Sequence, residues 1–191
     1  MLHFRALPLL AILIACSLRL APRAFADPTT DRIAALLDLY RCPVFAYLVA
    51  IHKTPTITRL DNRFLIVDID HRIDHRYYAQ CAFDDFDRKM ICEVSSPVFN
   101  PELRPYFKGA RLKRVKALGY RARRKDNYFQ WRDARTPDAL YAIAGLLVET
   151  LGYAFDMRPE EGLTYEAPLV PTKPDPPREA FSRCAPAISL R

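Results

Sequence analysis

Polar and apolar residues alternate from Arg76 to Ser96, and this alternation predicts a β-hairpin of defined register. Because strand side chains point alternately to two faces, the favoured register is the one that separates apolar from polar residues. A turn at 85–88 gives one nearly apolar face, with the opposed pairs Tyr77–Ser96, Ala79–Val94, Cys81–Cys92 and Phe83–Met90. The other face is mostly polar and places Asp84 opposite Lys89. A slip of one residue would destroy this separation.

Helical periodicity predicts one helix near each end of the domain. From Asp27 to Tyr40, apolar residues recur at helical spacing behind a threonine or aspartate cap. The second helix is predicted over Thr136 to Leu151, with Thr136 as the cap, Pro137 in the first turn and Gly152 as the stop. Its wide apolar face predicts packing on the apolar face of the sheet.

The remaining apolar segments predict further strands. Val44 to Ile51 is apolar on both faces and lies between two prolines, which favours a buried strand. A second hairpin is expected from 56–60 and 63–68, and another strand from Tyr128 to Arg132. Segment 111–118 fits a helix or a strand, and we expect a strand. The predicted fold is α+β, an antiparallel sheet of about five to six strands flanked by an N-terminal and a C-terminal helix.

Residues 1–26 have the pattern of a secretory signal peptide. A basic start is followed by an apolar run over 6–18 and by the cleavage pattern Ala24-Phe25-Ala26. The alternative is a bacterial lipobox at 13–16, which would attach a lipid to Cys16. Both interpretations predict export, to the periplasm or outside the cell. We expect no transmembrane helix in the mature chain.

The four cysteines that follow the signal predict two disulfides, since an even count in an exported chain is typical of disulfide pairing. The hairpin register pairs Cys81 with Cys92, which leaves Cys42 with Cys184. No C-x-x-C pair is present, and this disfavours a zinc site. The predicted organisation is a signal peptide over 1–26, an α+β domain over 27–157 and a proline-rich extended tail over 158–191.

The order of these elements resembles the YbjN-like group of small bacterial proteins. The residues that carry the resemblance are the segment Pro55–Val67, the cysteine-bearing hairpin, and the helix Thr136–Gly152 after Tyr128–Trp131. The resemblance covers about residues 30–155 and is topological. It implies a fold similar to type III secretion chaperones and no established catalytic residues.

Segment 104–125 concentrates ten basic residues, has no acid, and is interspersed with aromatic residues. The whole chain carries a net charge of +7, and loss of residues 1–26 removes three arginines and no acid, which leaves +4. For an exported chain, such a segment predicts contact with another protein or with an anionic envelope surface, and favours nucleic acid less. The alternative is a solvated charged face. The candidate binding residues are Arg111, Lys113, Arg114, Lys116, Arg121, Arg123, Arg124 and Lys125.

A second polar cluster has residue types that ligate metals. Its members are Asp68, Asp70, His71, Asp74 and His75. Arginines at 72 and 76 are interleaved with them and would repel a cation, so the alternative is a solvated turn in which these arginines pair the carboxylates.

The leading functional hypothesis is an exported, non-enzymatic envelope protein that binds another macromolecule through its basic, aromatic-rich surface. There is no G-x-S-x-G motif, the mature chain has few serines, and its cysteines are expected in disulfides, so we expect no catalytic residue and no cofactor. One alternative is a metal-dependent hydrolase that uses the Asp68–His75 cluster. The other is a secreted effector that binds nucleic acid or an anionic membrane.

Overall fold

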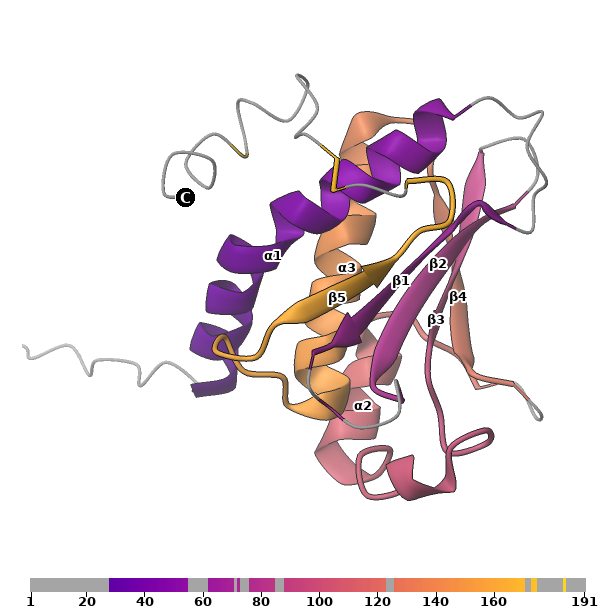
Figure 1. Ribbon diagram of the computed structural model, residues 1–191. Coiled ribbons are helices and arrows are strands. Elements are labelled where there is room, and N and C mark those ends of the chain that lie inside the picture. Colours follow the sequence, from indigo (N-terminus) through magenta and orange to yellow (C-terminus); the bar gives the residue numbers. More distant parts are fainter. Residues whose placement is uncertain are drawn as a thin grey trace, which may run out of the picture.

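The computed structural model shows two layers, a five-stranded antiparallel sheet and a layer of helices (Figure 1). The strand order is β4-β3-β2-β1-β5, and the N-terminal and C-terminal helices α1 and α3 flank the sheet. This confirms the predicted α+β fold. The structure describes residues 28–54, 62–70, 72, 76–84, 88–122, 126–170, 173–174 and 184. The elements are α1 Pro28–Lys53, β1 Phe64–Ile69, β2 Tyr78–Asp84, β3 Lys89–Val94, the short 3-10 helix η3 Pro101–Leu103, α2 Gly109–Ala117, β4 Tyr128–Asp133, α3 Pro137–Phe155 and β5 Leu163–Glu166.

The central hairpin has the predicted register. In the β2–β3 pair, Ala79 lies opposite Val94, Cys81 opposite Cys92 and Asp84 opposite Lys89. The apolar face of this pair is buried under the helices, as the alternation required. Residues 85–87 of the predicted turn lie outside the described residues. Tyr128–Asp133 forms β4 beside β3, which confirms the further strand expected at 128–132.

The predicted strand from Val44 to Ile51 is wrong, because these residues form the second half of α1. The helix continues through Pro43, although an internal proline removes a backbone hydrogen bond and costs about 3 kcal/mol. Burial of this half against α3 and the sheet offsets that cost. A helix covered on several sides has no polar face, so it lacks the periodicity that would distinguish it from a buried strand.

Segment 111–118, predicted as a strand, lies mostly in the helix α2. Val115 is buried, and Arg111, Leu112, Arg114 and Leu118 are half-buried on the same side of the helix. Of the second predicted hairpin, residues 64–69 form β1, whereas its first strand at 56–60 lies outside the described residues.

The C-terminal helix begins as predicted but ends one turn later. The Thr136 side-chain oxygen accepts a hydrogen bond from the Ala139 N–H at 3.1 Å, and Pro137 occupies the first turn. Gly152 is not the stop. The helix continues to Phe155 and ends at Asp156, whose φ of 54° is left-handed. Gly152 instead allows α1 to approach, because an added Cβ there would lie 2.3 Å from the Ile33 Cδ1.

The segment after residue 158 was predicted as an extended tail, yet it contains the edge strand β5. Val67 of β1 lies opposite Tyr165, and Ile69 lies opposite Leu163. Tyr165 also stacks on Tyr47 of α1, with ring centroids 4.7 Å apart. The compact part of the chain therefore extends beyond the predicted boundary at 157.

Both predicted disulfides are present, Cys81–Cys92 across the hairpin and Cys42–Cys184 from α1 to the C-terminal segment. Disulfides are typical of proteins that fold in an oxidising compartment, so this finding fits an exported chain. The signal peptide and Cys16 lie outside the described residues.

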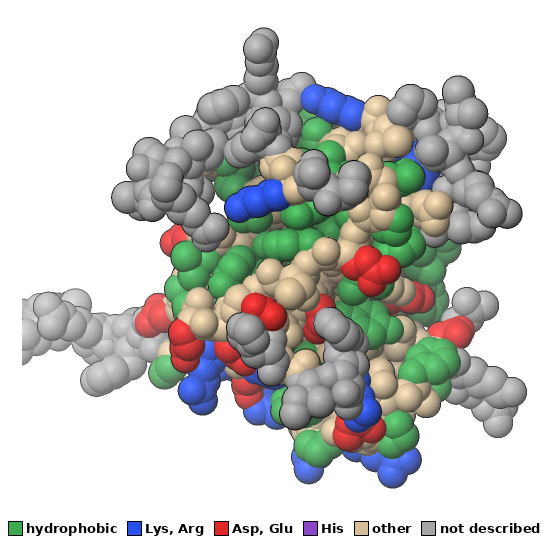
Figure 2. Space-filling model, viewed as in Figure 1, with side chains coloured by type: hydrophobic (Ala, Val, Ile, Leu, Met, Phe, Trp, Pro, Cys, Tyr) green, Lys and Arg blue, Asp and Glu red, His purple; other side chains and the backbone are tan. Residues whose placement is uncertain are grey.

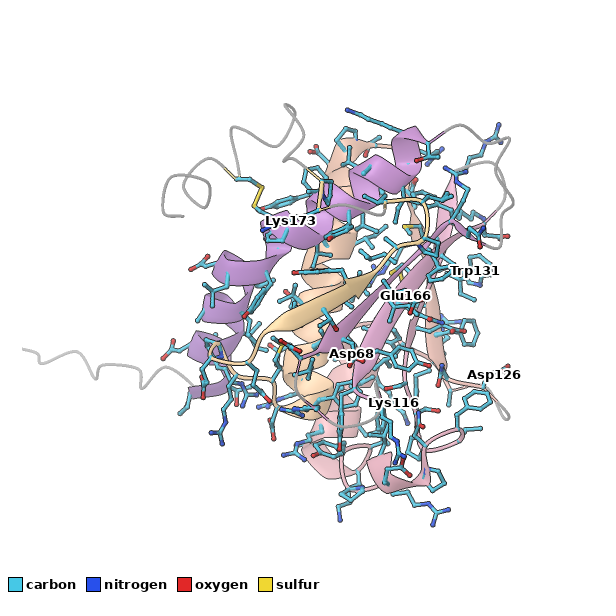
Figure 3. All side chains as sticks on the ribbon, viewed as in Figure 1. Asp68, Lys116, Asp126, Trp131, Glu166 and Lys173 are labelled. Carbon is cyan, nitrogen blue, oxygen red and sulfur yellow. A yellow bond between two sulfur atoms is a disulfide. The ribbon has the colours of Figure 1, made fainter. Side chains whose placement is uncertain are left out.

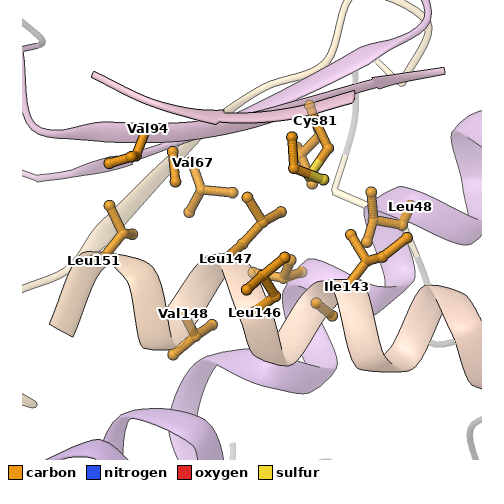
Figure 4. Close-up of a cluster of buried hydrophobic side chains, with 14 of the residues drawn as sticks. Leu48, Val67, Cys81, Val94, Ile143, Leu146, Leu147, Val148 and Leu151 are labelled. Atoms are coloured by element: carbon orange, nitrogen blue, oxygen red, sulfur yellow. A yellow bond between two sulfur atoms is a disulfide. The ribbon is translucent and has the colours of Figure 1, made fainter. Parts of the chain in front are cut away.

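The core lies between the sheet and the paired helices (Figure 4). Val67, Cys81 and Val94 of the sheet face Leu147 and Leu151 of α3. By length and composition alone, α1 and α3 could each cross a membrane, but core helices pass the same test. From the sequence we expected no transmembrane helix in the mature chain, because no stretch after the signal was judged long and apolar enough to span a bilayer.

The two glycines of α3 give a paired test of the α1–α3 contact. Alanine at either site gains about 1 kcal/mol of helix propensity. At Gly152, the new Cβ would press on buried Ile33 and Leu36, and such overpacking costs about 1–3 kcal/mol. At Gly145, the new Cβ meets only the guanidinium of Arg41, the far end of a long side chain that can shift over the Tyr141 ring. We expect urea unfolding to show that G145A stabilises and G152A destabilises the protein. Changes of the same sign would contradict this description of the contact.

Candidate functional site: the basic end of the molecule

The basic segment forms one end of the molecule. Residues 97–117 follow β3 beyond the end of the sheet and lead into α2 at the bottom of Figure 1. In the same view, several Lys and Arg side chains lie at this end beside exposed hydrophobic ones (Figure 2). We call residues 97–121 the basic end. Arg123, Arg124 and Lys125 of the predicted set lie outside the described residues.

Two of the predicted binding residues hold the fold together instead of pointing into solvent. Arg111 pairs with Asp156 and lies over the Tyr106 ring, with its Cζ 5.3 Å from the ring centroid. Arg114 lies over the Tyr153 ring at 5.6 Å. Both arginines therefore fix α2 to the C-terminal end of α3.

Asp156 joins three helices at this point. Its carboxylate accepts hydrogen bonds from Arg111 of α2 and from Arg32 of α1, the latter at 3.0 Å. Arg32 also donates to the Gly152 carbonyl at 3.2 Å. The C-terminal end of a helix carries partial negative charge, so these cations are favourably placed there. Asp156 therefore pairs with cations inside the fold and does not neutralise the exposed cations on the outer side of α2.

The remaining cations of the basic end point into solvent. They form no ion pair within the described part of the chain, and they are Arg104, Lys108, Lys113, Lys116 and Arg121. Glu102, the acid nearest to them in sequence, pairs with Arg76. In Figure 3, Lys116 lies toward the α2 end, whereas Trp131 lies farther along the sheet. This arrangement can attract a polyanion or an anionic surface.

An aromatic cluster attaches the basic end to the sheet and to α3. The Phe155 ring centroid lies 5.5 Å from that of Tyr77, 6.0 Å from Tyr106 and 5.9 Å from Phe107. Phe107 also stacks on Tyr128 of β4 at 5.2 Å. Burial raises the pKa of the Tyr77 hydroxyl, with the adjacent Tyr106 hydroxyl adding to the shift. The cluster packs the chain between η3 and α2 against the fold, so the backbone that carries the neighbouring cations has a fixed place.

Gly119 and Tyr120 return the chain from α2 to the sheet. Gly119 has a φ of +103°, a conformation that other residues rarely adopt. The Tyr120 hydroxyl is buried and hydrogen-bonded to Thr150 at 3.0 Å, and burial raises its pKa to about 12. Arg121 then pairs through its backbone with Phe129 of β4. Each end of the basic helix is thus fixed to the fold.

The sequence interpretation missed an exposed apolar turn at the basic end. Val98 is 50% exposed and Phe99 is 59% exposed. The turn itself is ordered by hydrogen bonds, since the Asn100 N–H donates to the Ser96 carbonyl at 3.1 Å. A Val-Phe pair beside three prolines gave no periodicity from which its exposure could be predicted.

The described part of the predicted metal cluster does not form a site. Asp68 is on the sheet face opposite the helices, whereas Asp70 packs against Gly162 of the segment before β5. Arg72 makes a bidentate pair with Glu161 at 2.7 and 2.9 Å. No group of three potential ligands occurs among the residues that the structure describes, and His71, Asp74 and His75 lie outside them.

Two of the shallow depressions on the described surface are lined mainly by residues outside the basic end. One, of about 410 Å³, follows β1, β2 and β5 on the open face of the sheet beside Asp68. The other, of about 550 Å³, is lined by α3, including Glu149, by Arg41 and Arg132, and by Ala117 and Leu118 at the end of α2. Burial raises the pKa of the Glu149 carboxyl, while the two arginines oppose the shift. Neither depression contains a serine or cysteine nucleophile beside a base, so neither has the constellation of a nucleophilic catalytic site.

Comparison with protein families, curated proteins and solved structures finds no match to this chain. The resemblance to the YbjN-like group therefore stays a prediction.

Proposed function

We propose that this is an exported, non-enzymatic envelope protein whose basic end binds an anionic partner, either a macromolecule or an envelope surface. The observation that carries the proposal is the separation of roles among the cations. Arg111 and Arg114 are held by contacts within the fold, while the five exposed cations have no acidic partner in the described part of the chain. A charged surface that the fold does not use for its own stability remains available for a partner.

The geometry of the support favours binding over a solvated charged face. Lys113 and Lys116 project from a helix fixed at both ends and backed by the Phe155 aromatic cluster. A fixed helix backbone lowers the ordering entropy that binding must overcome. The two disulfides fit an oxidising compartment, which makes an envelope partner more suitable than a cytosolic nucleic acid.

The test is binding of heparin, a soluble polyanion, at increasing salt. We expect affinity to fall steeply as salt rises, because the attraction is electrostatic and is screened. K113E/K116E should weaken binding about tenfold or more, since a basic residue near an anionic surface contributes about 1 kcal/mol. These lysines are exposed, so the melting temperature should change little.

The matched control is R88E/K89E, a double charge reversal at the hairpin end of the sheet, where both side chains are exposed. It changes the net charge of the protein by the same amount, but away from the basic end. We expect it to leave most of the heparin affinity in place. Equal losses from the two variants would show that only overall charge matters and would contradict the proposed site.

A further inference from the structure

The exposed turn at Pro97–Asn100 carries two large apolar side chains that a charged surface by itself does not require. Val98 and Phe99 are the most exposed large hydrophobic residues in the described part of the chain, ahead of Trp131 at 49% and Leu39 at 40%. The Val98 N–H donates to the Ser96 Oγ at 3.3 Å, so the backbone is held while the side chains face outward. An ordered turn with an apolar tip is suited to contact with an apolar phase.

Cations adjoin this tip. Arg104 and Lys108 follow it in the chain, and the chain continues directly into α2, which presents Lys113 and Lys116. Glu102 lies between tip and cations, but it is paired with Arg76. Exposed apolar residues flanked by Lys and Arg are the pattern of surfaces that lie in the headgroup region of an anionic bilayer. A soluble polyanion offers the cations a partner but gives an aliphatic side chain such as Val98 none.

The N-terminal end of α1 lies at the same end of the molecule. The Arg114 Nη1 donates to the Thr29 Oγ1 at 3.4 Å, so α1 begins beside α2. The sequence before Pro28 contains the apolar run over 6–18 and the alternative lipid site at Cys16. A membrane-attached N-terminus would therefore bring the basic end toward the bilayer.

We propose that the partner of the basic end is an anionic phospholipid membrane, into whose surface Val98 and Phe99 insert while the neighbouring cations contact the headgroups. This inference rests on the proposed function and names the partner of that same surface. It also gives a role to the apolar turn, which the electrostatic proposal leaves unexplained.

Vesicle co-sedimentation of the exported protein, with its disulfides intact, tests this inference. The vesicles contain phosphatidylethanolamine alone or mixed with phosphatidylglycerol. We expect binding to the phosphatidylglycerol vesicles and little binding to the neutral ones. V98S/F99S should weaken vesicle binding about tenfold or more, because the variant lacks the two apolar side chains whose transfer from water into the membrane favours binding. The same variant should keep its heparin affinity, since no charge has changed.

L39S is the matched control, because Leu39 is an exposed apolar residue in the middle of α1, away from the turn. We expect it to bind vesicles as the parent protein does. Insertion has its own spectroscopic signature. Trp131 is the single tryptophan, so in the W131F/F99W variant all tryptophan emission comes from position 99. This emission should shift to the blue when phosphatidylglycerol vesicles are added.

The possible outcomes separate the two proposals. Heparin binding without vesicle binding would overturn the membrane inference and leave the proposed function standing, with a soluble polyanion as partner. Vesicle binding unchanged in V98S/F99S, or no blue shift in W131F/F99W, would overturn the insertion of the turn. If the parent protein bound neither heparin nor phosphatidylglycerol vesicles, both proposals would be overturned.

Discussion

Removal of the Cys42–Cys184 bond should lower the free energy of unfolding by about 5 kcal/mol, the largest effect expected in this protein. The bond joins residues 142 positions apart, and the entropy that a cross-link removes from the unfolded chain grows with the length of the loop it closes. The Cys81–Cys92 bond joins residues only 11 apart, and the same relation gives it about 2–3 kcal/mol.

The measurement is urea unfolding of C42A/C184A beside C81A/C92A, each compared with the parent protein. Cys184 is buried, and its bond fixes it to Cys42 of α1. A loss for C42A/C184A no larger than that for C81A/C92A would contradict the prediction. That result would mean that breaking the bond also raises the entropy of the folded chain. This gain would offset the entropy that the unfolded chain gains.

The central hairpin could be predicted in detail because two independent constraints agree there. The alternation of apolar and polar residues fixes the face of each side chain, and one slip would expose Phe83 and Met90 to solvent. The register that satisfies this constraint also places Cys81 opposite Cys92. The structure has that register and that bond.

The second half of α1 could not be predicted in the same way. Val44 to Ile51 is buried against α3 and the sheet. Apolar residues are therefore needed on several sides of the helix, and the sequence lacks the alternation of polar and apolar positions that marks a helix. Pro43 suggested that the first helix ends there, but tertiary packing stabilises a helix that continues past it to Lys53. β5 was missed for a related reason. It is a four-residue edge strand in a proline-rich region, and its pairing with β1 depends on contacts distant in sequence.

The candidate site was predictable in its charge but not in its geometry. The density of Lys and Arg over 104–125 identified the segment. The sequence could not show, however, that Arg111 is paired within the fold whereas Lys113 is exposed to solvent. That separation depends on Asp156, which lies 45 residues away from Arg111. The exposure of Phe99 was equally inaccessible, because it is set by the fold of the turn after β3.

Replacement of Phe155 by alanine should both destabilise the protein and loosen the basic end. The Phe155 side chain is fully buried and touches the rings of Tyr77, Tyr106 and Phe107. Loss of a buried phenylalanine costs about 3–5 kcal/mol through lost burial and the remaining cavity. Because Tyr106 and Phe107 lie between η3 and α2, the cavity would open directly beneath the cations.

Hydrogen exchange distinguishes this local effect from a general loss of stability. L147A is the matched control, because Leu147 is equally buried but packs under the centre of the sheet (Figure 4). We expect amides of η3 and α2 to exchange faster in F155A than in L147A at equal global stability, since local opening then needs less free energy than global unfolding. Equal protection of α2 in the two variants would show that the aromatic cluster does not support the basic end. The fixed backbone of α2, which presents Lys113 and Lys116 and on which the binding proposal depends, would then need another cause.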